Sequence, residues 1–245
     1  MSISTHYTVE QEQAWNSRQL EVSVAAPRFH VWTYATPTVV LGCSQRALHA
    51  EIACKLPQGL ALVQRPSGGG AVLTGPWLVG VSVVLPVVHP WVRGGLVDSY
   101  RELGRLHAAV LAGLGISSRA LPPAEVAQAN AALGASVDWA CYGSLAPWEL
   151  IDARGRKLVG LAQRRQRNGI LLVAGTLIQV PDWPLLCTAL GHPEDAPAMR
   201  RRTVACEELT ERPPSAAALV AGLEHALALA LPDAARPQPA SAHLA

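Results

Sequence analysis

Lysine is scarce in this sequence, and charged residues in general are few. Of the 20 basic residues only Lys55 and Lys157 are lysines, charged residues make up 16% of the 245 positions, and the formal net charge is +2. Proteins that bind nucleic acids through the phosphate backbone carry dense clusters of basic residues. The composition therefore argues against a general nucleic-acid-binding protein.

Patterns typical of disulfide frameworks and metal sites are also lacking. The five cysteines are odd in number and include no C-x-x-C pair, and the eight histidines include no H-E-x-x-H motif. Disulfide-stapled secreted domains and zinc sites depend on such spacings. We therefore expect neither a disulfide framework nor a metal site. The cysteines are Cys43, Cys54, Cys141, Cys187 and Cys206.

The sequence has no stretch with the pattern of a membrane span or a secretory signal. Residues 1–18 are polar and lack an apolar core, and the apolar residues 77–91 are interrupted by Gly80, Pro86 and Pro90. A spanning helix needs about 20 apolar residues in succession, and a signal peptide needs an apolar central region. The interrupted stretch therefore predicts a buried strand, and we expect a cytoplasmic protein that has no membrane partner.

Half of the residues are hydrophobic, which is enough for one substantial core in a chain of this length. Their periodicity predicts an α+β fold in which a mixed, mostly antiparallel β-sheet is flanked by helices. We expect a single domain over 9–231 and a disordered tail over 232–245. Helices are predicted at 9–21, 44–55, 99–115, 183–190 and 215–231, a helical or loose insert at 121–137, and strands at 28–33, 39–42, 60–64, 79–85, 149–152, 157–162 and 170–179.

The most informative stretch is residues 65–76, Arg-Pro-Ser-Gly-Gly-Gly-Ala-Val-Leu-Thr-Gly-Pro, between two apolar runs. Gly68, Gly69 and Gly70 remove every side chain from one patch of backbone, so that a ligand can lie against the N–H groups. Such a loop is costly in conformational entropy. Two interpretations stand side by side, namely a turn between strands and a cradle for a ligand.

A second segment, residues 153–167, carries six basic residues and no acidic one. It predicts a short strand that begins near Lys157, then a polar bend, and then an apolar strand over 170–173. A solvated face is the commoner interpretation of such a segment. However, Gly160 opens the backbone close to Lys157, and a compact ammonium can act as a point charge toward a carboxylate, a phosphate or an acyl carbonyl.

Together the two segments resemble the lipoate–protein ligase A and octanoyltransferase family, whose catalytic domain is shared in outline with biotin–protein ligases. The family pattern has an Arg, a Gly-Gly-Gly loop followed by Ala-Val, and a later Lys-x-x-Gly-x-Ala-Gln-Arg-Arg run. Residues 32–45 are similar to its early Trp…Pro…Leu-Gly-x-x-Gln strand pair. The matching residues of the two segments are Arg65, Gly68, Gly69, Gly70, Ala71, Val72, Lys157, Gly160, Ala162, Gln163, Arg164 and Arg165.

The resemblance implies a biotin/lipoate protein ligase-like domain that transfers a lipoyl or octanoyl group to a lysine of an apo lipoyl domain or a glycine-cleavage H protein. Ligases of the family activate lipoate or octanoate with ATP and Mg²⁺. Octanoyltransferases take the acyl group from acyl carrier protein through a cysteine thioester. The resemblance implies no tightly bound cofactor. It implies Lys157 as a catalytic residue and, as substrate-binding residues, Arg65, Ser67, Gly68, Gly69, Gly70, Ala71, Val72, Thr74, Gly160, Ala162 and Gln163.

Cys141 lies in a segment similar to the one that carries the nucleophile in one octanoyltransferase branch, ahead of Glu149. A thiol near the basic segment can serve as a nucleophile. A buried small apolar residue is the other interpretation of a free cysteine. The ligase and transferase branches therefore both stay open. The other four cysteines are expected to be core residues.

Two histidines of the family pattern are missing from this chain. Thr74 stands where one histidine is usual, and Ala174 stands where the pattern has His-Gly-Thr. A histidine can hydrogen-bond a carbonyl or a phosphate and carry a proton. The alternative to an acyl-transferring enzyme is therefore a non-catalytic acyl- or nucleotide-binding homologue, and a biotin–protein ligase-like activity is a third possibility.

Overall fold

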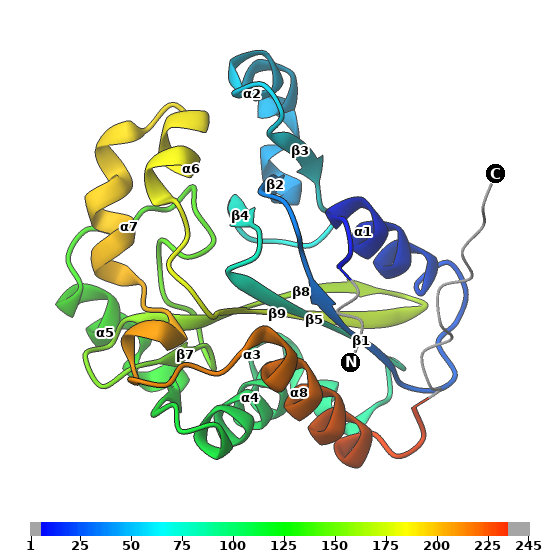
Figure 1. The fold of residues 1–245 in the computed structure, drawn as a ribbon. Coiled ribbons are helices and arrows are strands. Elements are labelled where there is room, and N and C mark those ends of the chain that lie inside the picture. Colours follow the sequence, from blue (N-terminus) through cyan, green and yellow to red (C-terminus); the bar gives the residue numbers. More distant parts are fainter. Residues whose placement is uncertain (1–5, 235–245) are drawn as a thin grey trace.

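The structure, a computed structural model, describes residues 6–234 and is built around two β-sheets (Figure 1). The strands are β1 (Arg28–Thr33), β2 (Thr38–Leu41), β3 (Ala61–Gln64), β4 (Val72–Thr74), β5 (Leu78–Leu85), β6 (Arg119–Ala120), β7 (Leu150–Ile151), β8 (Lys157–Gln166) and β9 (Gly169–Leu177). The larger sheet has the order β1-β5-β9-β8-β7-β6, and all of its neighbours are antiparallel. The smaller sheet has the order β3-β2-β4, in which β2 pairs parallel with β3 and antiparallel with β4.

Strand β5 lies between the edge strand β1 and β9 in the larger sheet, and all eight of its residues are buried. Val79, Val81 and Val83 belong to the hydrophobic cluster on one side of the sheet. Leu78 belongs to the cluster on the opposite side. Because side chains alternate between the two faces of a strand, a strand covered on both faces is expected to be apolar along most of its length. This arrangement explains the apolar stretch of the sequence and confirms the predicted buried strand.

Two long helices, α4 (Arg101–Gly113) and α8 (Ala216–Ala230), pack against one face of the larger sheet (Figure 1). Helix α8 buries Leu219, Leu223 and Leu227, which are four residues apart and therefore lie on one side of the helix. Helix α4 buries Leu103 and Leu111 in the same cluster.

The opposite face carries the small sheet and a second group of helices, with its own hydrophobic cluster. Thr8 begins α1 with a capping box, in which its hydroxyl accepts from the Gln11 N–H and its own N–H donates to the Gln11 side chain. The helices of this face are α1 (Val9–Arg18), α2 (His49–Lys55), α6 (Trp183–Ala189) and α7 (Ala196–Arg202). The remaining α-helices are short, namely α3 (Gly95–Asp98) and α5 (Val126–Ala132), and 3₁₀ helices span Cys43–Leu48, Pro90–Val92, Pro123–Glu125, Pro193–Asp195 and Cys206–Glu208.

The predicted α+β fold with a mixed, mostly antiparallel arrangement of strands is confirmed. The predicted polar bend after residue 162 is wrong, because β8 continues to Gln166 and closes a hairpin with Gly169. Pairing with β9 satisfies the backbone of this polar stretch, so tertiary contacts outweigh local composition. The structure also contains β4, β6 and α7, which were not predicted. Helix α1 ends at Arg18, three residues before the predicted end of the first helix.

Part of the predicted tail belongs to the described structure. The Ala234 N–H donates to the Leu231 carbonyl (2.9 Å), and Ala234 packs against the cluster beneath α8. Residues 235–245 lie outside the described residues. The single domain over 9–231 stays a prediction.

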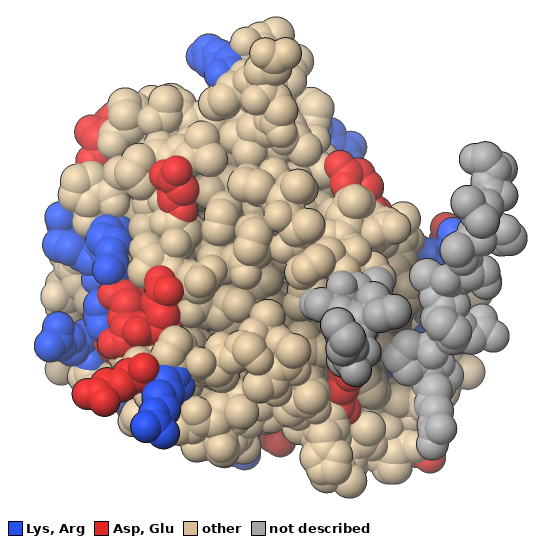
Figure 2. Space-filling model, in the orientation of Figure 1, with Lys and Arg blue, Asp and Glu red and all other residues tan. Residues whose placement is uncertain are grey.

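Charged side chains are sparse on the face shown in Figure 2 and gather toward one edge, where both signs occur. Helix α7 lies at this edge in Figure 1. Two ion pairs join Glu208 to Arg200 (2.7 Å) and to Arg156 (3.6 Å). A surface of mixed sign produces a weaker long-range field than a basic one. Within residues 6–234, no helix combines the length and apolarity needed to cross a membrane.

Shortening a buried side chain of α8 should destabilise the fold much more than shortening an exposed side chain of the same helix. Leu223→Ala removes a fully buried side chain and should lower the free energy of unfolding by about 2–5 kcal/mol. Leu229→Ala in the same helix removes a side chain that is 69% exposed and should change it by less than about 0.5 kcal/mol. Urea denaturation measures both variants, and equal losses would contradict the packing described for α8.

Candidate functional site

A cavity lies between the two sheets, and its walls come from segments that are far apart in the sequence. The larger sheet contributes β5, β8 and β9, the smaller sheet contributes β2 and β4, and the remaining wall comes from α1 and from three loops. Most lining residues are apolar or glycine. The lining residues are Glu12, Gln13, Tyr34, Val40, Arg65, Ser67, Val72, Thr74, Leu78, Gly80, Cys141, Tyr142, Gly160, Leu161, Ala162, Val173, Ala174 and Gly175.

Three glycines in register form part of the sheet side of this cavity. Gly175 of β9 pairs with Gly80 of β5 on one side and with Gly160 of β8 on the other. Two tyrosine hydroxyls occupy the space that side chains would take there. A β-carbon at Gly80 would lie 2.5 Å from the Tyr34 hydroxyl, and one at Gly175 would lie 2.8 Å from the Tyr142 hydroxyl. Glycine within these strands therefore permits the close approach of both rings.

The glycine loop (residues 65–71) is held in shape by the side chain of Arg65. Its Nη2 donates to the carbonyl oxygens of Gly68 (3.0 Å) and Gly70 (2.9 Å). Gly69 between them has φ +94°, a conformation that favours glycine. A β-carbon at Gly69 would lie 2.8 Å from Arg65 Nη2 and 3.7 Å from the Cys141 sulfur. The loop thus places bare backbone next to the thiol.

The cysteine loop (residues 137–144) pairs with the glycine loop through backbone hydrogen bonds. The Ala71 N–H donates to the Trp139 carbonyl (2.8 Å), and the Cys141 N–H donates to the Ala71 carbonyl (2.7 Å). Gln45 adds a side-chain contact, because its amide donates to the same Trp139 carbonyl (3.0 Å). A β-carbon at Gly70 would lie 2.3 Å from that oxygen, so the two loops can approach only through a glycine.

Cys141 is half-buried and lines the cavity, whereas the other four cysteines do not. Cys43 and Cys54 are exposed. Cys187 and Cys206 are buried, and burial raises the pKa of Cys187 to about 11 and that of Cys206 to about 12. A buried thiol of raised pKa is a poor nucleophile. The expectation of a core position is therefore confirmed for Cys187 and Cys206 but is wrong for Cys43 and Cys54.

Lys157 lies beneath the cysteine loop and is not among the residues that line the cavity. Its ammonium donates to the carbonyl oxygens of Cys141 (2.7 Å) and Ser144 (3.1 Å) and forms an ion pair with Glu149 (2.6 Å). The residue is only 1% exposed. An ammonium has three N–H donors, and each of the three has an acceptor here.

Two polar residues, Glu12 and Tyr34, line the cavity on the side of α1. The Tyr34 hydroxyl donates to a carboxylate oxygen of Glu12 (2.8 Å). Burial raises the pKa of Glu12, while the Tyr34 hydrogen bond and the charge of Arg65 oppose this change. Burial also raises the pKa of Tyr34 and of Tyr142 well above 10, so both hydroxyls stay protonated donors. The Tyr142 hydroxyl donates to the Gly175 carbonyl (2.6 Å).

The structure brings most of the predicted site residues to this one cavity. The predicted residues that line it are Arg65, Ser67, Val72, Thr74, Cys141, Gly160 and Ala162, and the rest of the glycine loop, Gly68, Gly69, Gly70 and Ala71, adjoins it. Gln163 does not reach the cavity, because its side chain donates to the Leu96 carbonyl (2.7 Å) and accepts from the Ser99 hydroxyl (3.1 Å) beside α3. Thr74 and Ala174, which replace the family histidines, both line the cavity.

Several residues of the site carry no sequence motif, namely Glu12, Tyr34, Tyr142 and Glu149, all of which are buried. The partners of the first three lie far away in the sequence, because Tyr34 pairs with Glu12 and Tyr142 pairs with Gly175. No local pattern reveals such partners. The strand glycines Gly80 and Gly175 gave a usable signal, since glycine inside a strand often marks a close approach of another group.

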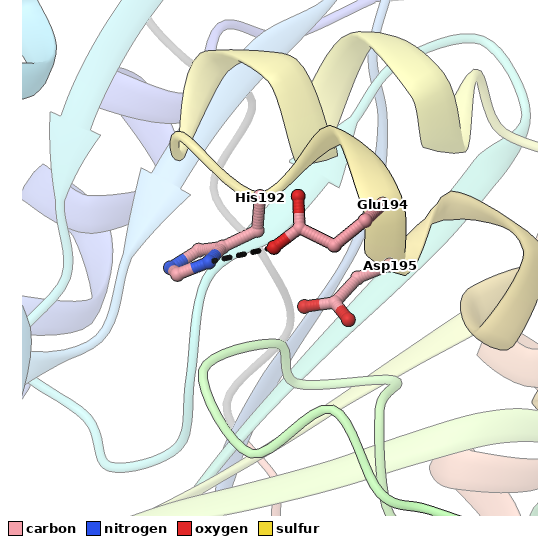
Figure 3. Close-up of side chains that lie close together, drawn as sticks. All are labelled: His192, Glu194 and Asp195. Atoms are coloured by element: carbon pink, nitrogen blue, oxygen red, sulfur yellow. Dashed lines mark ion pairs between the residues drawn. The ribbon is translucent and has the colours of Figure 1, made fainter.

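One group of possible metal ligands occurs in the described chain, and it lies outside the cavity (Figure 3). The ligand atoms of His192, Glu194 and Asp195 lie within 4.8 Å of one another, and His192 and Glu194 are exposed. Asp195 already accepts a hydrogen bond from the Trp139 indole (2.7 Å). This contact ties the cysteine loop to the turn before α7, which gives Asp195 a structural explanation without a metal.

Comparison with known proteins identifies the family. Residues 9–211 match the lipoyl protein ligase A/B catalytic domain. A protein of Kyrpidia tusciae named octanoyltransferase LipM is 32% identical over 212 residues, which cover 84% of this chain and 76% of the relative. The chain therefore belongs to the lipoyl protein ligase A/B catalytic-domain family, as the sequence resemblance implied.

Two solved structures share the fold. One is a bipartite lipoate protein ligase and its E2 lipoyl domain from Thermoplasma acidophilum, with a TM-score of 0.68, 16% identity, and coverage of 96% of this chain and 83% of that chain. The other is a lipoate-protein ligase A bound with ATP, with a TM-score of 0.67, 18% identity, and coverage of 96% and 85%. At these identities the likeness concerns the fold alone.

A side chain at Gly69 should block the cavity. In Gly69→Val the branched side chain must adopt a left-handed backbone conformation and displace Arg65, so we expect binding of octanoate or lipoate to fall by at least about tenfold. Gly68→Ala is the matched control, because a β-carbon there meets nothing within 4 Å. Calorimetry on both folded variants measures the effect, and equal affinities would mean that the glycines serve only as a turn.

Proposed function

We propose that this protein is an octanoyltransferase that carries the acyl group on Cys141. In the first step the Cys141 thiolate attacks the carbonyl of a thioester-bound octanoyl group, and the donor thiol leaves. In the second step the ε-amine of a lysine on an apo lipoyl domain or a glycine-cleavage H protein attacks the new thioester. An amide forms, and the Cys141 thiol is released. The chemistry of covalent catalysis by an activated thiol matches this sequence of steps.

The position of Cys141 is the single observation that carries the proposal. Its sulfur lies at a cavity whose walls include Val40, Val72, Leu78 and Val173. Such walls suit a saturated acyl chain, since burial of each methylene contributes about 0.8 kcal/mol. Arg65 is the basic residue among those lining the cavity, and its cation can stabilise a nearby thiolate.

The comparisons favour an acyl-transferring enzyme over a non-catalytic homologue. The relative from Kyrpidia tusciae is named an octanoyltransferase, which supports a thioester donor such as octanoyl acyl carrier protein. The archaeal ligase structure includes a lipoyl domain, which supports an acceptor of this kind. Thr74 donates its hydroxyl to the Thr38 carbonyl (3.1 Å) and Ala174 has no polar group, so neither replaces the proton chemistry of a histidine.

The mass of the acceptor protein after the reaction distinguishes an octanoyltransferase from an ATP-dependent ligase. The protein is incubated with an apo lipoyl domain and either octanoyl acyl carrier protein or lipoate with ATP and Mg²⁺. An octanoyl mass increase that needs no ATP supports the proposal. Modification that strictly requires ATP would establish a ligase instead, and an unmodified acceptor under both conditions would support a binding protein.

Cys141→Ser should abolish the acyl-enzyme. The unsubstituted protein mixed with octanoyl acyl carrier protein should gain the mass of one octanoyl group, and hydroxylamine should remove it, because it cleaves thioesters. Cys54→Ser, at an exposed cysteine away from the cavity, is the control and should keep the adduct. An adduct that persists in Cys141→Ser would exclude Cys141 as the nucleophile.

Lys157→Ala should lower acyl transfer by about 100-fold or more, because the cysteine loop loses the ammonium that holds it and the thiol is no longer correctly placed. The substitution leaves the carbonyl oxygens of Cys141 and Ser144 and the carboxylate of Glu149 without their buried partner. Lys157→Arg should also be impaired, because a flat guanidinium cannot replace a compact ammonium at three converging acceptors. Lys55→Ala, at the other, exposed lysine, should leave transfer unchanged. Full transfer by a folded Lys157→Ala protein would contradict a role of Lys157 in holding the cysteine loop in place for the reaction.

A further inference from the structure

The ion pair between Lys157 and Glu149 is buried, and its lysine faces the cysteine loop. Both side chains are 2% exposed, and Nζ lies 2.6 Å from the carboxylate. The other two donors of the ammonium reach backbone carbonyls of the loop, at Cys141 and Ser144. The pair therefore connects the loop that carries the cavity thiol to the start of β8.

Glu149 is itself held in place by backbone donors. One carboxylate oxygen accepts from the Leu161 N–H of β8 (3.1 Å), and the other accepts from the Ala146 N–H (2.8 Å). Burial raises the pKa of Glu149, while Lys157 and these two hydrogen bonds oppose the change. Both carboxylate oxygens thus have backbone partners that fix their position, and Glu149 is not among the residues that line the cavity.

The ionisable groups around the ammonium come from several elements. They are the carboxylate of Glu149, the thiol of Cys141 and the phenols of Tyr142 and Tyr100. The ring centre of Tyr142 lies 5.2 Å from Nζ. Burial, together with the charges of Glu149 and Cys141, raises the pKa of Tyr100. The neighbouring Arg156 pairs with Asp152 (2.9 Å). Glu149 is therefore the one carboxylate in contact with Lys157 in the described chain.

We propose that Glu149 is a positioning residue for Cys141, because its carboxylate keeps Lys157 charged and directed at the two loop carbonyls. A charge in a buried position is costly unless a counter-charge and hydrogen bonds compensate it. Without Glu149, burial favours the neutral amine. A neutral amine has one donor fewer and a weaker hold on the carbonyl oxygens. The inference rests on the proposed role of Cys141 only for its catalytic consequence.

The scarcity of lysine makes the pair accessible to NMR. Labelling with lysine enriched in ¹³C at the ε-position should give two signals, one from Lys157 and one from the exposed Lys55. In Glu149→Gln we expect the Lys157 signal to move toward that of a neutral amine at a lower pH than in the unsubstituted protein. The Lys55 signal should be the same in both proteins. Identical Lys157 titrations in the two proteins would overturn the inference.

Glu208→Gln is the matched control for the loss of a carboxylate. Glu208 pairs with Arg200 and Arg156, outside the cavity, so its loss should leave the Lys157 signal unchanged. If Glu149→Gln does not fold, the Lys157 signal of the unsubstituted protein tests the inference instead. A Lys157 signal of the neutral amine at the pH of the transfer assay would show that the carboxylate does not hold the charge, and this result also overturns the inference.

A kinetic measurement connects the pair to the reaction. For Glu149→Gln relative to the unsubstituted protein, the rate of octanoyl-Cys141 formation should fall by at least about tenfold, and the ratio of the two rates should fall further as the pH rises. The affinity for octanoate should stay the same, because Glu149 does not line the cavity. A ratio that does not change with pH would indicate a merely structural role and contradict the inference.

The two proposals fail in different ways. If the unsubstituted protein forms no octanoyl adduct, the proposed function fails, but the lysine titration still tests the pair. If the adduct forms normally and Glu149→Gln leaves both the titration and the rate unchanged, the positioning role fails alone.

Discussion

The site depends on the pairing of two loops that meet at Ala71 and Ala140. Two short backbone hydrogen bonds, from Ala71 to the Trp139 carbonyl and from Cys141 to the Ala71 carbonyl, place the thiol beside the glycine loop. The approach is possible because Gly70 has no side chain where the Trp139 backbone lies. The position of the thiol at the cavity and the reach of Lys157 to the Cys141 carbonyl both follow from this pairing.

The cavity stays apolar because the polar groups around it are paired with one another. The Tyr142 hydroxyl donates to the Gly175 carbonyl, and the Tyr34 hydroxyl donates to the Glu12 carboxylate. The Lys157 ammonium pairs with Glu149 and donates to the two loop carbonyls. Buried polar groups need such partners, and a satisfied group competes little for a ligand. The surface that remains for a ligand is therefore largely hydrocarbon and glycine backbone, with the Arg65 cation and the Cys141 thiol among its polar groups.

Local patterns predicted the parts of the structure that depend on neighbouring residues. The apolar stretch of β5, the helix at 215–231 and the three glycines before Ala71 were all readable, and the structure agrees with each of them. The interpretation was less successful for Gln163, which points to α3 although its neighbours Gly160 and Ala162 line the cavity. Alternation along a strand sends adjacent residues to opposite faces, and the sequence motif treated them as one group.

The sequence by itself determined most of the elements, the family and the set of unusual residues, namely the glycines, a rare lysine and a cysteine in a loop. Periodicity and backbone freedom are local properties, so the order of residues is sufficient to predict them. Only the tertiary structure decided that Cys141, and none of the other four cysteines, reaches the cavity, and that Lys157 holds a loop and pairs with Glu149. Those outcomes depend on burial and on contacts between distant segments, and burial decides whether a charge needs a partner and whether a thiol can react.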